Sequence, residues 1–162
     1  MATEVIIVMI AVIVLALVFN GIEDYSKDTE VMSFREAMDL AELPVVTFYQ
    51  GKEKFNFLLD TGSNHSHISQ KALDRIKGEE YTGSLDVSGV GGNAEVNKAL
   101  KVVLEYKKNH YEALLFVGEH LDPTFKSIKE STGVTIHGII GNSFLNENKY
   151  VLDFDDLIAY KK

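Results

Sequence analysis

The sequence of 162 residues contains no cysteine and no tryptophan, and only 2 prolines. Without cysteine the chain forms no disulfide, no thiolate zinc site and no cysteine nucleophile. Basic side chains are outnumbered, because 16 Lys and Arg against 24 Asp and Glu give a formal net charge of −8. A nucleic-acid partner requires a basic face, so this charge argues against one. Walker A and G-x-S-x-G motifs are absent too, which excludes the nucleotide and serine-hydrolase sites that they mark.

One long apolar segment is present at the N-terminus. The uninterrupted run Val5–Phe19 spans roughly 22 Å as a helix, and Ala2–Ile22 spans about 31 Å. Because a bilayer core is about 30 Å thick, the segment predicts a single-pass membrane anchor and a membrane localisation. A signal peptide fits less well, since Met-Ala-Thr-Glu carries no Lys or Arg. A core helix is rarely apolar on all sides. The side of the membrane on which the remaining chain lies stays open.

The residues after this segment divide into a linker and a domain. Asn20–Met32 is polar and acidic, as expected for a solvated linker. Ser33 and Glu36 match a capping box, which predicts a short helix to about Glu42 that Pro44 ends. We therefore expect an anchor at residues 1–22, a linker with a short helix at 23–43, and one folded domain at 44–162.

The domain has the pattern of a mostly β fold. β-branched and aromatic residues recur in short runs that turn residues separate. The expected strands are Val45–Tyr49, Phe55–Leu59, Tyr81–Val87, Ala94–Tyr106, His110–Val117, Val134–Ile140, Tyr150–Asp153 and Leu157–Tyr160. The expected helical segments are Ser69–Lys77, Thr124–Ser131 and Ser143–Asn148, the second as no more than a turn. This pattern predicts antiparallel strands with one or two small helices.

The stretch Asp60-Thr61-Gly62-Ser63 is the most informative motif. Two apolar strand residues deliver the Asp60 carboxylate into a loop, and Gly62 permits a tight turn. We expect the Ser63 hydroxyl to donate to that carboxylate, which would favour its ionised form. A bare D-T-G triplet is also compatible with an ordinary turn after a strand.

A second marker, Ile139-Ile140-Gly141, follows after a glycine-rich hairpin at residues 88–93. The order of D-T-G-S, this hairpin and I-I-G resembles the retropepsin-like aspartic peptidases, the family of single-domain retroviral proteases and their cellular relatives. The resemblance covers Pro44–Lys162. It implies a closed antiparallel acid-protease β-barrel with one or two short helices, to which the apolar segment adds an N-terminal transmembrane helix.

The resemblance also implies roles for individual residues. Asp60 is the expected catalytic aspartate, Thr61 the residue that interlocks two active-site loops, and Gly62 the glycine of the tight turn. The hairpin resembles the flap that closes over substrate. Substrate-binding residues are expected to be Ser63, Asn64, His65, Gly89, Val90, Gly91, Gly92 and Ile140. Neither a cofactor nor a metal is expected.

The chemistry of this family requires two carboxylates that share a proton and activate a water molecule. The chain carries a single D-T-G, because Ser131-Thr132-Gly133 has serine in place of the aspartate. The second carboxylate is therefore expected from a second copy, in a C2 homodimer that cleaves a peptide or protein substrate. The function predicted is a membrane-anchored aspartic endopeptidase.

Four other interpretations remain open. His65 and His67 are two residues apart, so in a strand both rings would lie on the same face and could bind one metal ion. Two imidazoles alone are fewer ligands than a metal site usually has. Asn142, where retroviral enzymes often carry arginine, is expected to cap the short helix after it. A non-proteolytic binding or assembly module with the same fold is the alternative function. A processing enzyme that cleaves its own linker at Asn20–Met32 is the third candidate function.

Overall fold

The structure is a computed structural model that describes residues 30–82, 86–89, 92–95 and 98–162. The chain divides into two compact units, Met1–Glu30 and Val31–Lys162, and the second contains the elements that follow. They are β1 (Val31–Ser33), α2 (Arg35–Ala41), β2 (Val45–Gln50), β3 (Glu53–Leu59), β4 (Ser66–Ser69), α3 (Gln70–Leu73), β5 (Glu79–Tyr81), β6 (Asp86–Gly89), β7 (Gly92–Glu95), β8 (Ala99–Tyr106), β9 (Asn109–Gly118), α4 (Leu121–Thr132), β10 (Gly138–Ile140), α5 (Asn142–Glu147), β11 (Tyr150–Asp153) and β12 (Ile158–Lys161).

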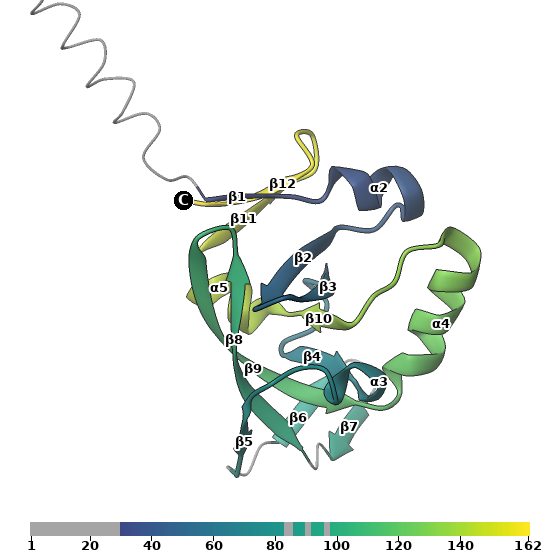
Figure 1. Ribbon diagram of the computed structural model, residues 1–162, viewed down its shortest axis with the longest axis vertical. Coiled ribbons are helices and arrows are strands. Elements are labelled where there is room, and N and C mark those ends of the chain that lie inside the picture. The colour runs from purple at the N-terminus through teal and green to yellow at the C-terminus, as the bar shows by residue number, and fades with distance from the viewer. Residues whose placement is uncertain (1–29, 83–85, 90–91, 96–97) are drawn as a thin grey trace, which may run out of the picture. The chain divides into compact units, whose positions relative to one another are not determined.

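The described strands form a closed, mixed barrel (Figure 1). The strand order is β2-β3-β10-β4-β9-β8-β5, and a further pairing of Tyr49 with Glu105 joins β2 to β8 and closes the ring. Most pairs are antiparallel, but β10 runs parallel to β3, and β4 runs parallel to β9. The expected closed and mostly antiparallel barrel is therefore present, but these two pairs are parallel where antiparallel pairing was expected. In both parallel pairs the two strands are far apart in the sequence and are joined by long crossover connections. A prediction that pairs each strand with the next one along the chain does not find such pairs.

The barrel interior is filled by aromatic and branched side chains. In β3 the residues Phe55, Phe57 and Leu59 are buried, as the two-residue period of a strand requires. Phe48 of β2 lies at the centre, with its ring 5.9 Å from Phe57 in an edge-to-face arrangement. We call this group the main core. It is the packing that holds the end of β3, and the loop after it, in place.

A second, smaller sheet has the order β1-β12-β11. β1 overlaps the C-terminal end of the predicted linker, Asn20–Met32. Its Met32 is nevertheless buried in the main core. The following helix α2 ends before Pro44, as expected, but the capping box does not form. Phe34 is the N-cap and makes no side-chain cap hydrogen bond. The Ser33 hydroxyl accepts weakly from the Arg35 amide, at 3.4 Å.

Helices cover one side of the barrel, where α3 and α4 lie side by side (Figure 1). The described part of residues 44–162 has three helices, α3, α4 and α5, where one or two were expected, and α2 is the short helix expected before Pro44. The turn expected at Thr124–Ser131 is the twelve-residue helix α4. Pro123 is compatible with the first turn of this helix, and Gly133, at φ 79°, ends it. α4 packs through a second apolar group, the side cluster, which consists of Val45, Leu121, Phe125, Ile136 and Ile139.

The membrane-spanning helix in the expected fold class also requires correction. Among the residues that the structure describes, no helix has the length and apolar character needed to cross a membrane. We therefore withdraw this helix from the fold class. The segment on which the expectation rested, residues 1–22, lies outside the described residues.

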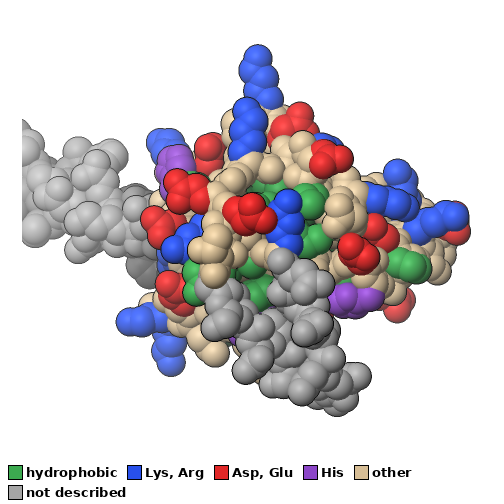
Figure 2. Space-filling view, turned by 90° about the horizontal axis from the view of Figure 1, so that it is seen from below, with side chains coloured by type: hydrophobic (Ala, Val, Ile, Leu, Met, Phe, Trp, Pro, Cys, Tyr) green, Lys and Arg blue, Asp and Glu red, His purple; other side chains and the backbone are tan. Residues whose placement is uncertain are grey.

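The surface of the domain is mixed in charge. On the face drawn in Figure 2, acidic and basic side chains are interspersed around a patch of hydrophobic side chains.

The glycine-rich hairpin is present as the paired strands β6 and β7, whose last pair is Gly89 with Gly92. Val90 and Gly91, expected at its tip, lie outside the described residues.

Candidate active site

Asp60 follows β3 directly, at the edge of the barrel where the parallel strand β10 also ends. The Asp60 amide donates to the Ile140 carbonyl at 3.0 Å, so the two sequence markers meet in space. Their pairing, Ile139 with Leu58 and Ile140 with Leu59, explains why two apolar residues precede the loop in both segments. The half-buried Asp60 is thus held by main-chain bonds to β10.

The loop after Asp60 is a tight turn closed by its own carboxylate. The Gly62 amide donates to Asp60 Oδ1 at 2.8 Å, and the Ser63 amide donates to the Asp60 carbonyl at 3.2 Å. A Cβ at Gly62 would lie 3.1 Å from the same carboxylate oxygen, so the absence of a side chain keeps this approach open. The Ser63 hydroxyl donates to the His65 carbonyl at 2.7 Å, and not to the Asp60 carboxylate as expected.

The start of α5 is bonded to the same loop. The Asn142 amide donates to the Ser63 carbonyl at 2.8 Å, and the Ser143 amide donates to the Asn64 carbonyl at 3.0 Å. The Asn142 side chain donates to the Thr61 carbonyl at 2.6 Å. Asn142 therefore does not cap α5, whose N-cap is Gly141 without a side-chain hydrogen bond. It joins α5 to the loop instead.

Ser66 and Gly141 complete this framework. The buried Ser66 hydroxyl accepts from the Gly141 amide at 3.1 Å. A Cβ at Gly141 would lie 2.8 Å from the Ser63 carbonyl oxygen and closer still to that of His65, so only glycine fits there. Sequence reasoning missed Ser66 as a site residue. No local pattern marks Ser66, because its partner Gly141 lies 75 residues away in the sequence and only the fold brings the two together.

Imidazoles gather beside the loop on the side of β4. The His67 ring lies 5.9 Å from Phe116 and 6.3 Å from His120, and the His65 ring lies 5.0 Å from Phe116. Burial, followed by His120 and His65, lowers the pKa of His67 to about 4, and Asp60 opposes this shift. His67 is therefore neutral above about pH 4. Its Nδ1 is buried without a hydrogen-bond partner in the described structure.

The remaining predicted residues differ in exposure. Thr61, Gly62 and Asn64 are exposed, while Ser63 and His65 are half-buried. Ile140 is fully buried in the main core, so its side chain offers no surface to a substrate in the single chain. Their roles in catalysis and substrate binding stay predictions. Within the described residues, no group of three or more His, Asp or Glu is arranged to hold a metal.

The sequence pattern of a known family spans the site. A model of the family described as "Aspartyl protease" matches residues 45–144, which include Asp60, Gly62 and Ile140. The chain belongs to the aspartyl protease family. This confirms the resemblance to retropepsin-like aspartic peptidases that the motifs indicated.

Among solved structures, this aspartyl protease is similar to the EIAV protease complexed with the inhibitor HBY-793. The match has 24% identity and a TM-score of 0.47, and covers 67% of this chain and 90% of that one. No curated protein matches the chain.

Proposed function

We propose that the chain is an aspartic endopeptidase in which the Asp60 carboxylates of two copies activate one water molecule. The observation that carries the proposal is the framework around Asp60. Main-chain hydrogen bonds from the Asp60 amide to Ile140, and from Asn142 to Ser63, hold the loop between β10 and α5. Membership of the aspartyl protease family supports the same chemistry.

A second copy supplies what the single chain lacks. The chain carries one D-T-G motif, so it contributes one Asp60 carboxylate. Two carboxylates placed face to face share one proton, because two negative charges at this distance repel each other. Exposed Thr61 lies next to Asp60, in the position from which the family resemblance expects contact between the two loops.

The reaction then needs no group beyond the two carboxyls and water. The ionised carboxylate takes a proton from the water, whose oxygen attacks the peptide carbonyl carbon. The protonated carboxyl gives its proton to the carbonyl oxygen, which becomes a hydroxyl of the tetrahedral intermediate. The carboxyl that took the water's proton then gives it to the nitrogen as the C–N bond breaks. The other carboxylate takes back a proton from one hydroxyl, and the carbonyl forms again. Because His67 is neutral above about pH 4, it places no fixed cation beside Asp60 in this range.

The decisive experiment incubates the full-length protein with a diverse peptide library between about pH 4 and 7, where such a dyad operates. We expect endoproteolytic cleavage that pepstatin inhibits. Asp60→Asn should abolish it, whereas the matched variant Asp39→Asn, on the exposed surface of α2, should retain it. A wild-type dimer that cleaves no peptide would contradict the proposal and favour the binding or assembly module.

A further inference from the structure

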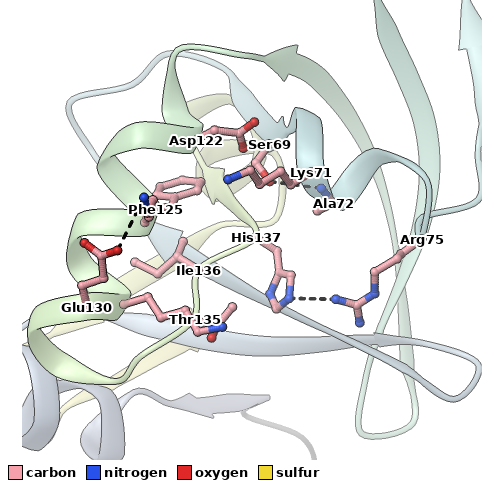
Figure 3. A pocket seen from close by; sticks show the side chains of 12 residues that line it. Ser69, Lys71, Ala72, Arg75, Asp122, Phe125, Glu130, Thr135, Ile136 and His137 are labelled. Carbon is pink, nitrogen blue, oxygen red and sulfur yellow. Dashed lines mark hydrogen bonds and ion pairs between the residues drawn. The ribbon is translucent and has the colours of Figure 1, made fainter.

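One pocket of the described domain, which Asp60 does not line, lies between α3, α4 and the segment that leads into β10 (Figure 3). It has a volume of about 610 Å³, within the usual range for ligand sites. Ala72, Phe125 and Ile136 are buried and form an apolar floor. Charged side chains from α3, α4 and the turn after α3 surround this floor, and His137 lies at one side.

His137 presents an N–H group to this pocket whatever its charge. Its Nδ1 accepts from the backbone amide of Asn56 at 3.0 Å. A ring nitrogen that accepts a hydrogen bond carries no proton, so the proton of the neutral ring is on Nε2. Protonation would add a hydrogen and would not remove this one. Nε2 is therefore a donor.

The Nε2 donor faces a second donor. Arg75 Nη1 lies 3.1 Å from His137 Nε2, the contact drawn as a dashed line in Figure 3. A guanidinium has no acceptor, so this contact joins two N–H groups and is not a satisfied hydrogen bond. Glu53 keeps Arg75 there, because its Oε2 accepts from Arg75 Nε at 3.1 Å and from Nη2 at 2.7 Å. What is missing at this position is one acceptor atom that accepts from both His137 Nε2 and Arg75 Nη1.

The surrounding charges indicate the kind of acceptor. Lys71 and Lys129 line the same pocket, and burial together with the charges of Arg75 and Lys129 lowers the pKa of His137. The site is thus electropositive around Nε2. Asp122 and Glu130 are at the pocket too, and Glu130 pairs with Lys126 at 3.6 Å. These acids disfavour a doubly charged anion such as phosphate and leave a single carboxylate as the better match.

We propose that this pocket binds a peptide segment through a carboxylate, one of whose oxygens accepts from both His137 Nε2 and Arg75 Nη1. An oxygen about 2.9 Å from each nitrogen satisfies both donors. The apolar floor receives a neighbouring aliphatic or aromatic side chain of the segment. β10 starts directly after His137 and ends at the Ile140 carbonyl that holds Asp60. The segment therefore binds at the end of β10 opposite to the catalytic loop, and its recognition does not depend on catalysis.

The test measures binding by fluorescence anisotropy on the full-length Asp60→Asn protein, so that hydrolysis cannot consume the probe. The probe is a fluorescein-labelled octapeptide with one glutamate between two leucines and serine at the other positions, and the reference peptide has glutamine in place of the glutamate. We expect the glutamate peptide to bind at least tenfold more tightly. Arg75→Gln should weaken its binding at least tenfold, and Lys129→Gln about twofold to fivefold. Lys108→Gln, on the exposed turn between β8 and β9, should have no effect.

A second readout does not depend on the folding of the Arg75 variant. Addition of the glutamate peptide should raise the pKa of His137, followed by the NMR shift of its imidazole in the Asp60→Asn protein. Equal binding of the two peptides, or an unchanged His137 titration, would overturn the proposal. Inorganic phosphate that binds as tightly as the glutamate peptide would assign the pocket to a small anion and overturn it as well. Loss of cleavage by the wild-type protein would bear on the proposed function alone.

Discussion

Asn142 links the two segments of the candidate active site through one side-chain hydrogen bond, to the Thr61 carbonyl at 2.6 Å. Asn142→Ala removes this bond but leaves the backbone bond from Asn142 to Ser63. We expect the free energy of unfolding to fall by about 1 kcal/mol. The value of kcat should fall about tenfold, because the loop that carries Asp60 loses one of its positioning contacts.

The matched control for this change is Asn146→Ala, which removes an exposed asparagine from the same helix. It should alter neither stability nor kcat. Urea unfolding and peptide hydrolysis, measured on both variants, separate the two effects. If Asn142→Ala lowered stability while kcat stayed at the wild-type value, Asn142 would be a purely structural residue.

His67 makes stability depend on pH. Its pKa is about 4 in the folded protein against 6.5 for an unperturbed histidine, with burial as the main cause. Between these values the unfolded chain binds more protons, so stability rises with pH. The contribution is complete above about pH 6.5 and is lost as the pH falls towards 4. The pKa of His137 is lowered too, which adds to the same trend.

We therefore expect the melting temperature of the wild-type protein to fall between pH 6.5 and 4, and His67→Gln to make this fall smaller. His110→Gln serves as the control, because the His110 side chain is 63% exposed. Thermal unfolding followed by circular dichroism at several pH values gives the comparison. Equal pH dependence in the wild-type and His67→Gln proteins would show that His67 does not titrate as described.

At the scale of elements, β10 is the strand that ties the barrel to the site. It lies between β3 and β4, and Gly138 is its first residue. A Cβ at Gly138 would lie 2.6 Å from Phe57 Cε1 and closer still to the carbonyl oxygen of His67. Because a backbone carbonyl within a sheet has little room to move, we expect Gly138→Ala to lower the free energy of unfolding by about 1–3 kcal/mol.

Urea denaturation of Gly138→Ala, with Thr124→Ala on the exposed surface of α4 as the reference, measures this effect. The reference should stay within about 0.5 kcal/mol of the wild-type protein. A Gly138→Ala protein as stable as the wild type would mean that the strand can shift to admit a methyl group, and that β10 is less closely packed than the structure indicates.

The elements also differ in how far their sequences predict them. β3 is predicted well, since Phe55, Phe57 and Leu59 alternate with more exposed residues and the signal is local. β4 is not predicted, because its Ser66 and His67 lack an apolar pattern although the strand lies between β9 and β10. The direction of β10 beside β3 depends on where the intervening chain packs, which no local pattern records.

The candidate site follows the same division. The spacing of D-T-G-S and I-I-G identified Asp60 and the segment that contacts it, because both are continuous motifs. The bond from the Asn142 side chain to Thr61 and the bond from the Gly141 amide to Ser66 depend on tertiary approach. Sequence reasoning therefore assigned Asn142 to a helix cap, the nearest local partner, and assigned Ser66 no role.

At the scale of the whole molecule, the proposed activity depends on the number of copies, since one chain contributes one D-T-G. Mixing tests this directly. A fixed amount of wild-type protein, combined with increasing Asp60→Asn protein under conditions that allow exchange of subunits, should lose activity as mixed dimers with one aspartate form. At a ninefold excess of the variant, random pairing would leave about a tenth of the wild-type subunits in wild-type dimers.

The control for mixing uses the same excess of Asp60→Asn protein, with activity measured immediately, before subunits exchange. Activity should be unchanged at this point and should then decline as exchange proceeds. Competition for substrate alone would lower activity at once and would be relieved by more substrate, whereas subunit exchange would not. Full activity after complete exchange would mean that one Asp60 is sufficient. In that case the second carboxylate of the proposed mechanism would have to come from the same chain, and the homodimer would be contradicted as the active species.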